Sequence, residues 1–110
     1  MRDALIRGDE LHIPSLCDIE YASALRRAAN ADRGDIVRID ERLAAYLALP
    51  LRRHAHESLL RRVLELRRLL SAYDATYVAL AEMLGAALLT QDRAMARAIQ
   101  TSREISVTLL

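Results

Sequence analysis

The first half of the chain alternates between short apolar runs and longer stretches with helical spacing. Leu11 and Ile13 form a brief apolar run that Pro14 closes, which predicts a short buried strand. Ser15 is a suitable helix N-cap, and residues 16 to about 29 are predicted to form a helix. A second helix is predicted from about residue 34 to residue 49, where Pro50 stops it.

The middle of the chain carries a third helical pattern, whose wet face is rich in arginine. Its apolar positions are Leu59, Leu60, Val63, Leu64, Leu66 and Leu69. Taken alone, these central segments could equally belong to a helical bundle.

The second half of the chain predicts buried elements that need covering layers. Residues 72 to 84 are apolar almost all the way round and precede Gly85, as in a buried helix with a glycine C-terminal stop. A fully apolar strand at residues 87 to 89, another helix and a strand at residues 104 to 109 follow. Strands that alternate with helices favour an α/β fold, a three-layer sandwich with a short parallel sheet flanked by helices, in a single domain of residues 1–110.

Composition limits the class of protein. The 110 residues are 53% hydrophobic and 28% charged, which is typical of a globular domain. The formal net charge of +1 gives no global basis for a nucleic-acid coat or a membrane surface. No apolar run is long enough to span a bilayer, and the single cysteine, Cys17, excludes an internal disulfide, so we expect a cytoplasmic protein.

Three carboxylates stand in apolar or helix-starting positions and are the candidate chemistry. Glu20 lies on an otherwise inward-facing stripe of the first helix, although pairing with Arg26 or Arg27 would explain it equally well. Asp74 has the spacing of a capping box with Ser71, and Asp92 that of a helix N-cap.

Together, Glu20, Asp74 and Asp92 suggest a metal site, because strand ends and the following helix starts converge at one edge of an α/β sheet. Crowded carboxylates select a hard cation, Mg²⁺ or Mn²⁺, which suits phosphodiester hydrolysis. The competing candidates are weaker: His54 and His56 are predicted to be solvated loop residues without a third zinc ligand, and Cys17 is predicted to be a small buried residue.

The segments "LHIPSLCDIEYASALRR" and "YDATYVALAEMLGAALLTQD" resemble the PIN-domain toxins of the VapC family, over roughly residues 9 to 100. The resemblance implies a metal site at Glu20, Asp74 and Asp92 and Mg²⁺-dependent endoribonuclease activity on RNA such as tRNA. It also implies a VapB-type antitoxin as partner and a homodimer.

One feature departs from that family. Its members begin with an apolar strand that carries a first acid, and neither Asp3 nor Asp9 lies in such a context, so the first strand is expected to be absent and the domain incomplete at its N-terminus. The alternative functions are a catalytically inactive module that binds antitoxin or dimerises, and a purely helical interaction or DNA-binding bundle. Arg93 is a candidate for contact with RNA phosphates.

Overall fold

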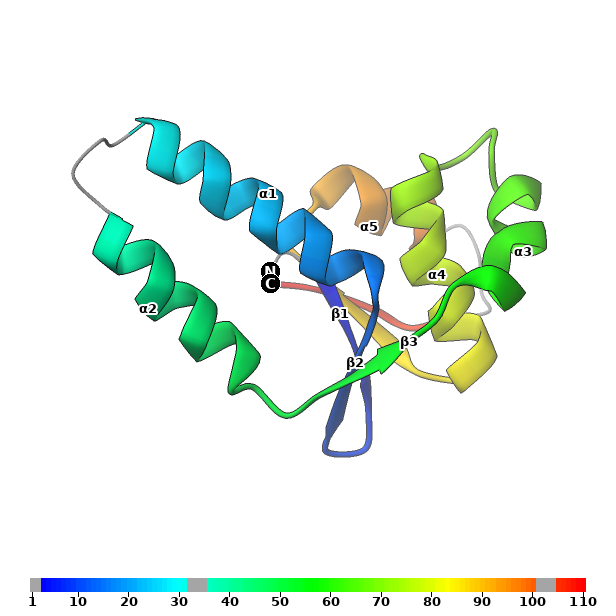
Figure 1. Cartoon of the computed structure of the whole chain (residues 1–110). Helices are drawn as coiled ribbons and strands as arrows, with labels where there is room; N and C mark the ends of the chain where they lie inside the picture. The colour runs from blue at the N-terminus through cyan, green and yellow to red at the C-terminus, as the bar shows by residue number, and fades with distance from the viewer. Residues whose placement is uncertain (1–2, 32–35, 101–104) are drawn as a thin grey trace.

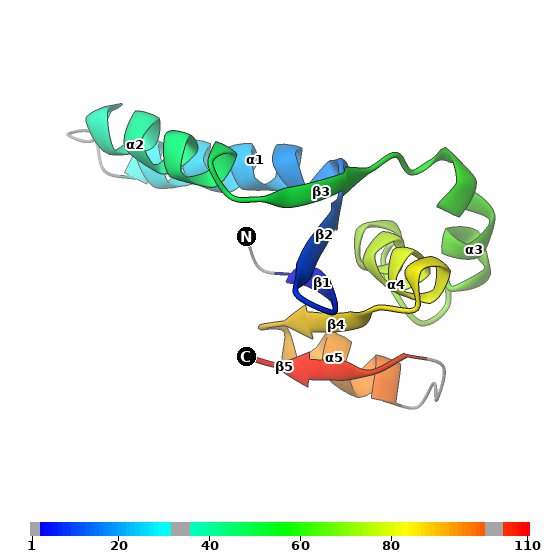
Figure 2. The ribbon, with the colours of Figure 1, turned by 90° about the horizontal axis from the view of Figure 1, so that it is seen from below.

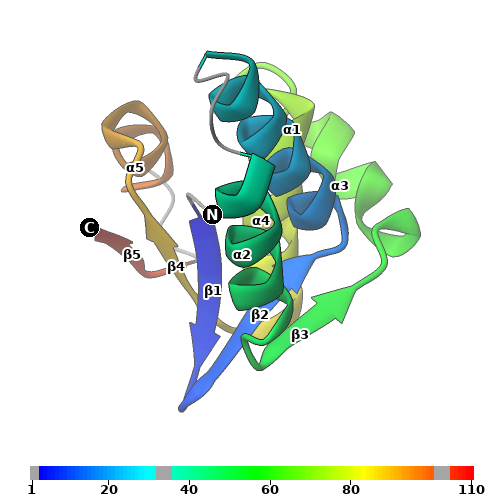
Figure 3. The same cartoon turned by 60° about the vertical axis from the view of Figure 1, so that its left-hand side comes forward.

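The computed structural model describes residues 3–31, 36–100 and 105–110. Its strands form one five-stranded sheet in the order β3-β2-β1-β4-β5, which can be followed across Figure 3. The strands are β1 (Asp3–Arg7), β2 (Glu10–Pro14), β3 (Leu51–His54), β4 (Ala87–Thr90) and β5 (Val107–Leu109). The predicted α/β class is confirmed.

The helices are α1 (Leu16–Ala31), α2 (Ile36–Leu47), the short 3₁₀ turn η1 (Glu57–Leu59), α3 (Leu60–Glu65), α4 (Ala72–Leu84) and α5 (Arg93–Gln100). Helix α4 packs on β1, β2 and β4, whereas α5 packs on β4 and β5. Helices α1 and α2 lie side by side and project together beyond the sheet (Figures 1 and 2). Within the described ranges, none of the helices has both the length and the apolar character of a membrane span.

Two predicted boundaries lie outside the described residues, and a third differs from the observed one. The expected starts of the second helix at residue 34 and of the last strand at residue 104 lie outside the described residues. The third helix is shorter than predicted, because α3 ends at Glu65 and turns follow up to the N-cap of α4.

Strand β1 was not predicted from the sequence, and the absence of the family's own first strand stays a prediction. Asp3–Arg7 occupies the centre of the sheet and pairs antiparallel with both β2 and β4, whereas the pairs β2–β3 and β4–β5 are parallel. The sheet is therefore mixed rather than parallel. Arg7 pairs with Glu10 across a two-residue turn in which Gly8 has φ 64° and no non-glycine residue has positive φ, as a type II′ hairpin requires.

Both faces of this central strand are buried in the core. Consecutive strand residues point to opposite faces, and both Ala4 (6% exposed) and Leu5 (0%) are buried. Helix α4 supplies much of the cover, and its ends are set as predicted: Ser71 caps its start, and Gly85 ends it with φ 62°. This packing fixes α4 against β1, and so places residues of α4 and the start of β1 beside α1.

Candidate functional site

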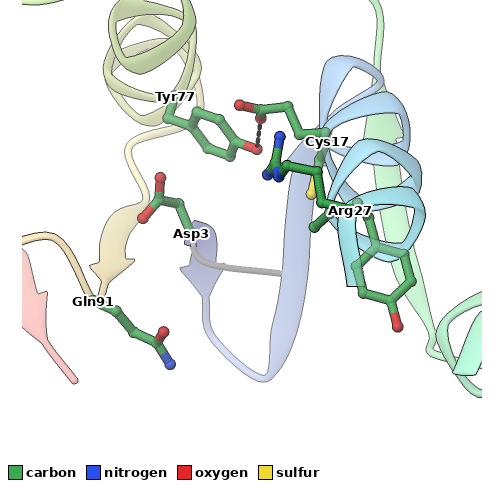
Figure 4. Close-up of a pocket in the computed structure, with 8 residues that line it drawn as sticks. Asp3, Cys17, Arg27, Tyr77 and Gln91 are labelled. Atoms are coloured by element: carbon green, nitrogen blue, oxygen red, sulfur yellow. Dashed lines mark hydrogen bonds between the residues drawn. The ribbon is translucent and has the colours of Figure 1, made fainter. Parts of the chain in front are cut away.

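A pocket of about 300 Å³ lies where α1, α4 and the start of β1 meet (Figure 4). Its polar lining includes two carboxylates, Asp3 and Glu20, together with the side chains of Arg27 and Gln91. Tyr77 and Cys17 form part of its wall. A pocket lined by two carboxylates and an arginine suits a cation together with a phosphate, because the carboxylates bind the cation and the guanidinium binds the phosphate.

Glu20 is fixed in this pocket by a buried tyrosine of α4. The Tyr77 hydroxyl donates to Glu20 Oε1 at 2.6 Å, as the dashed line in Figure 4 shows. Tyr77 is only 2% exposed, and burial raises the pKa of its hydroxyl far above the usual 10, with further contributions from Cys17 and Glu20. The phenol therefore stays protonated and acts as a hydrogen-bond donor that orients the carboxylate.

Asp3 is the residue that the sequence reasoning missed. It was set aside for lacking an apolar strand context, yet it lies in β1, is 3% exposed and lines the same pocket as Glu20. The Thr90 hydroxyl, at the end of β4, donates to Asp3 Oδ1 at 2.5 Å. The available signal was the pair Gly8–Asp9 between two apolar runs, which is typical of a two-residue hairpin.

Asp92 is tied to Asp3 through the same threonine. Its backbone N–H donates to Thr90 Oγ1 at 3.0 Å, and its Oδ1 accepts from the backbone N–H of Met95 at 3.0 Å. The second bond is the N-cap of α5 that was weighed as the alternative to metal binding. Asp92 does not line the pocket.

Asp74 stands in the first turn of α4, three residues after the N-cap Ser71. Its backbone N–H donates to Ser71 Oγ at 3.1 Å in the first turn of α4. The side chain is half-buried and stands one helical turn before Tyr77, but it is not part of the pocket lining. The structure thus brings Glu20 to a pocket, whereas Asp74, in the first turn of α4, and Asp92, at the start of α5, do not line it.

The fit of a metal ion can be tested on this donor set. Over the described ranges, no group of three or more His, Cys, Asp or Glu side chains is arranged to hold an ion. Two carboxylates, Asp3 and Glu20, do open to one pocket. Mg²⁺ commonly binds through one or two carboxylates, with water and substrate phosphate completing its shell, so the donors fit an open Mg²⁺ site and not a closed protein cage.

The structure also places the three remaining candidate residues, two histidines and a cysteine. His54 is not a solvated loop residue: it ends β3, is half-buried, and its Nε2 lies 2.9 Å from Nδ1 of the buried His12. Burial, His12 and Arg52 lower the pKa of His54. His56 is exposed, as predicted. Cys17 is a free, buried cysteine, also as predicted.

Comparison with known proteins identifies the family of this chain. The family model described as PIN domain matches residues 1–99. A VapC ribonuclease of Mycobacterium bovis is 42% identical over 103 residues, which cover 94% of this chain and 81% of the relative. Ribonuclease VapC9 of Mycobacterium tuberculosis matches to the same extent. Ribonuclease VapC12 of that organism is 32% identical over 107 residues, covering 93% of this chain and 79% of the relative.

The chain thus has the fold of a PIN-domain protein. More narrowly, the chain belongs to the VapC family of PIN-domain ribonucleases.

Proposed function

We propose that this chain is a Mg²⁺-dependent endoribonuclease and the toxin of a type II toxin–antitoxin pair. The observation that carries the proposal is the pocket in which Asp3 and Glu20 face the same space beside Arg27. Family membership supports the choice of RNA as substrate, since the relatives are named ribonucleases.

The metal would be held by Glu20 and by Asp3, which the hairpin brings to the same pocket. Metal binding by Asp74 and Asp92 is proposed from the family resemblance, since neither residue lines that pocket. Mn²⁺ would suit the same oxygen donors. A bound ion would activate water and stabilise the leaving oxygen of the phosphodiester.

The chain's own residues prepare the site for that ion. Tyr77 orients Glu20, and Thr90 orients Asp3, each by a hydroxyl that donates to the carboxylate. Both hydroxyls are buried, so water competes little for these bonds, and each carboxylate is held in one direction before substrate binds. Arg27 lies at the same pocket and would bind a phosphate oxygen of the RNA. Arg93, by contrast, is exposed and does not line it.

The proposed partners are a VapB-type antitoxin, an RNA substrate such as tRNA, and a second copy of the chain in a homodimer. A catalytically inactive module that binds antitoxin or dimerises is the second candidate function. It is favoured by one observation: the described residues present two carboxylates at the pocket, not three.

An RNA cleavage assay separates the two functions. The wild-type chain is incubated with a labelled RNA in Mg²⁺ or in EDTA, beside Glu20→Gln, Asp74→Asn and Asp92→Asn. The ribonuclease proposal predicts cleavage in Mg²⁺ that EDTA abolishes and that Glu20→Gln reduces at least 100-fold, the order of loss for a group that stabilises charge in the transition state. No cleavage by the wild type in either Mg²⁺ or Mn²⁺ would contradict it and favour the binding module.

A further inference from the structure

Beside the acidic pocket lies a second hollow of about 310 Å³ that shares Glu20 and Arg27 with it. Its other wall is the side chain of Tyr73, in the first turn of α4, which is 60% exposed. The remaining lining comes from Leu16, Ile19 and Ser23 of α1. A continuous surface therefore leads from the carboxylates, past Arg27, to an exposed aromatic ring.

Arg27 differs from the arginines that stabilise the fold. Arg53 is paired with Asp18 at 2.8 Å and Arg62 with Glu82 at 2.8 Å. Arg27 donates to Ser23 Oγ at 3.2 Å, and in the part of the chain that the structure describes it forms no ion pair with a carboxylate. A guanidinium has five N–H donors, so most of those of Arg27 remain for an anion.

The exposed ring of Tyr73 suits contact with a nucleotide base. A phenol ring that is mostly exposed can stack on a base, and an aromatic next to a cation on an open groove is the usual arrangement for single-stranded nucleic acid. The bases of a duplex are already stacked on one another, whereas those of a loop or single strand are free to stack on a side chain.

We propose that Arg27 and Tyr73 form a subsite for one nucleotide of single-stranded RNA, next to the phosphate that is cleaved. Arg27 binds the phosphate and Tyr73 stacks on the base. The subsite rests on the proposed function for the location of the cleaved phosphate. A protein segment is the competing occupant, because Ile19 is also exposed here, but an apolar segment would leave the arginine and the carboxylate beside it desolvated.

The test measures RNA affinity without cleavage. The full chain is titrated in EDTA into a fluorescein-labelled single-stranded RNA of 12 nucleotides, which is about the length of one such binding groove. Fluorescence anisotropy gives the Kd. A blunt duplex of the same sequence is the comparison. The variants are Tyr73→Ala, Tyr73→Phe and Arg27→Gln, with Arg26→Gln as control, because Arg26 is the exposed neighbour that lines neither hollow.

The subsite predicts that Tyr73→Ala weakens binding of the single strand about 5- to 150-fold, the effect of losing one stacked base, and that Tyr73→Phe restores it. Arg27→Gln should lower the slope of log Kd against log salt by about 0.7, the value for one phosphate of a single strand, while Arg26→Gln leaves it unchanged. The duplex should bind more weakly than the single strand and respond little to Tyr73→Ala.

Wild-type affinity in both Tyr73→Ala and Arg27→Gln would overturn the subsite and favour a protein segment on this surface. Absence of single-strand binding by the wild type would overturn it as well. The same proteins assayed for cleavage in Mg²⁺ distinguish the two proposals: normal cleavage with unchanged affinities refutes the subsite alone, and Tyr73-dependent binding without cleavage refutes the nuclease alone.

Discussion

Replacement of Thr90 by valine should test whether one buried hydroxyl holds both the Asp3 carboxylate and the backbone of Asp92. Thr90 is 0% exposed, and its hydroxyl donates to Asp3 Oδ1 at 2.5 Å while it accepts from the Asp92 backbone N–H at 3.0 Å. Valine keeps the branched shape but removes both bonds. A hydrogen bond to a charged group contributes about 1.5–3 kcal/mol and a neutral one about 0.5–1.5 kcal/mol, so we expect Thr90→Val to lower the free energy of unfolding by about 2–4 kcal/mol.

Thr76→Val is the matched control. Thr76 is also buried, but its hydroxyl donates to the carbonyl of Ala72 within the same helix, at 2.8 Å. Such a bond stabilises little, so the expected cost is below about 1 kcal/mol. In urea denaturation, with a slope near 1.5 kcal/mol/M, Thr90→Val should lower the midpoint by about 1–3 M at an unchanged slope. Equal midpoints for the two variants would refute the assignment of these bonds to Thr90.

Three further predictions concern other parts of the chain. Tyr77→Phe removes the donor to Glu20 and should raise the Mg²⁺ concentration for half-maximal cleavage about 10-fold, whereas Tyr46→Phe, which removes a similar donor to Asp18 away from the pocket, should not. Gly85→Ala should cost about 1 kcal/mol in urea denaturation, because φ is 62° there although no atom would clash with the new methyl group. The pKa of His54 is lowered in the folded chain, so between that pKa and the ordinary value of 6.5 the unfolded chain binds more protons. Stability should therefore fall as pH drops from about 6.5. His54→Gln should flatten this dependence in urea titrations at several pH values.

The elements that the sequence predicted well are those that local signals determine. Helix α4 has a serine N-cap, a glycine with positive φ at its end and an apolar surface, and each signal is complete within the segment. Strand β4 was predicted for the same reason, as a fully apolar run before Asp92.

The missed strands are short and contain charged residues, so their own sequences predict them only weakly. β3 contains Arg52 and Arg53, so its polar sequence does not predict a strand. The strand forms at the edge of the sheet by pairing with β2. β1 spans only five residues and begins and ends with charged side chains, yet it fills the centre of the sheet because the turn at Gly8 folds it back on β2.

The candidate site could be predicted only where a charged side chain falls on an apolar, inward-facing stripe. Glu20 stood out as an acid on an inward stripe, and it does line the pocket, although its role as a metal ligand stays a prediction. The N-cap bond of Asp92 is confirmed, as is the bond from the Asp74 backbone to Ser71, and metal binding by either acid stays a prediction. Asp3 was not placed because the hairpin signal at Gly8–Asp9 was missed and because its contact with Thr90 joins residues that are 87 positions apart in the chain.

The central claim is that Asp3 and Glu20 share one ion-binding pocket. The most direct measurement is the binding of Mn²⁺, followed by electron paramagnetic resonance, to the wild type, Asp3→Asn, Glu20→Gln and Asp9→Asn. Asp9 is the matched control, because it is an acid of the same hairpin that is exposed in the turn. The account predicts that Asp3→Asn and Glu20→Gln each weaken Mn²⁺ binding about 10- to 100-fold, whereas Asp9→Asn binds like the wild type. Wild-type affinity in Asp3→Asn, or equal losses in Asp3→Asn and Asp9→Asn, would contradict it.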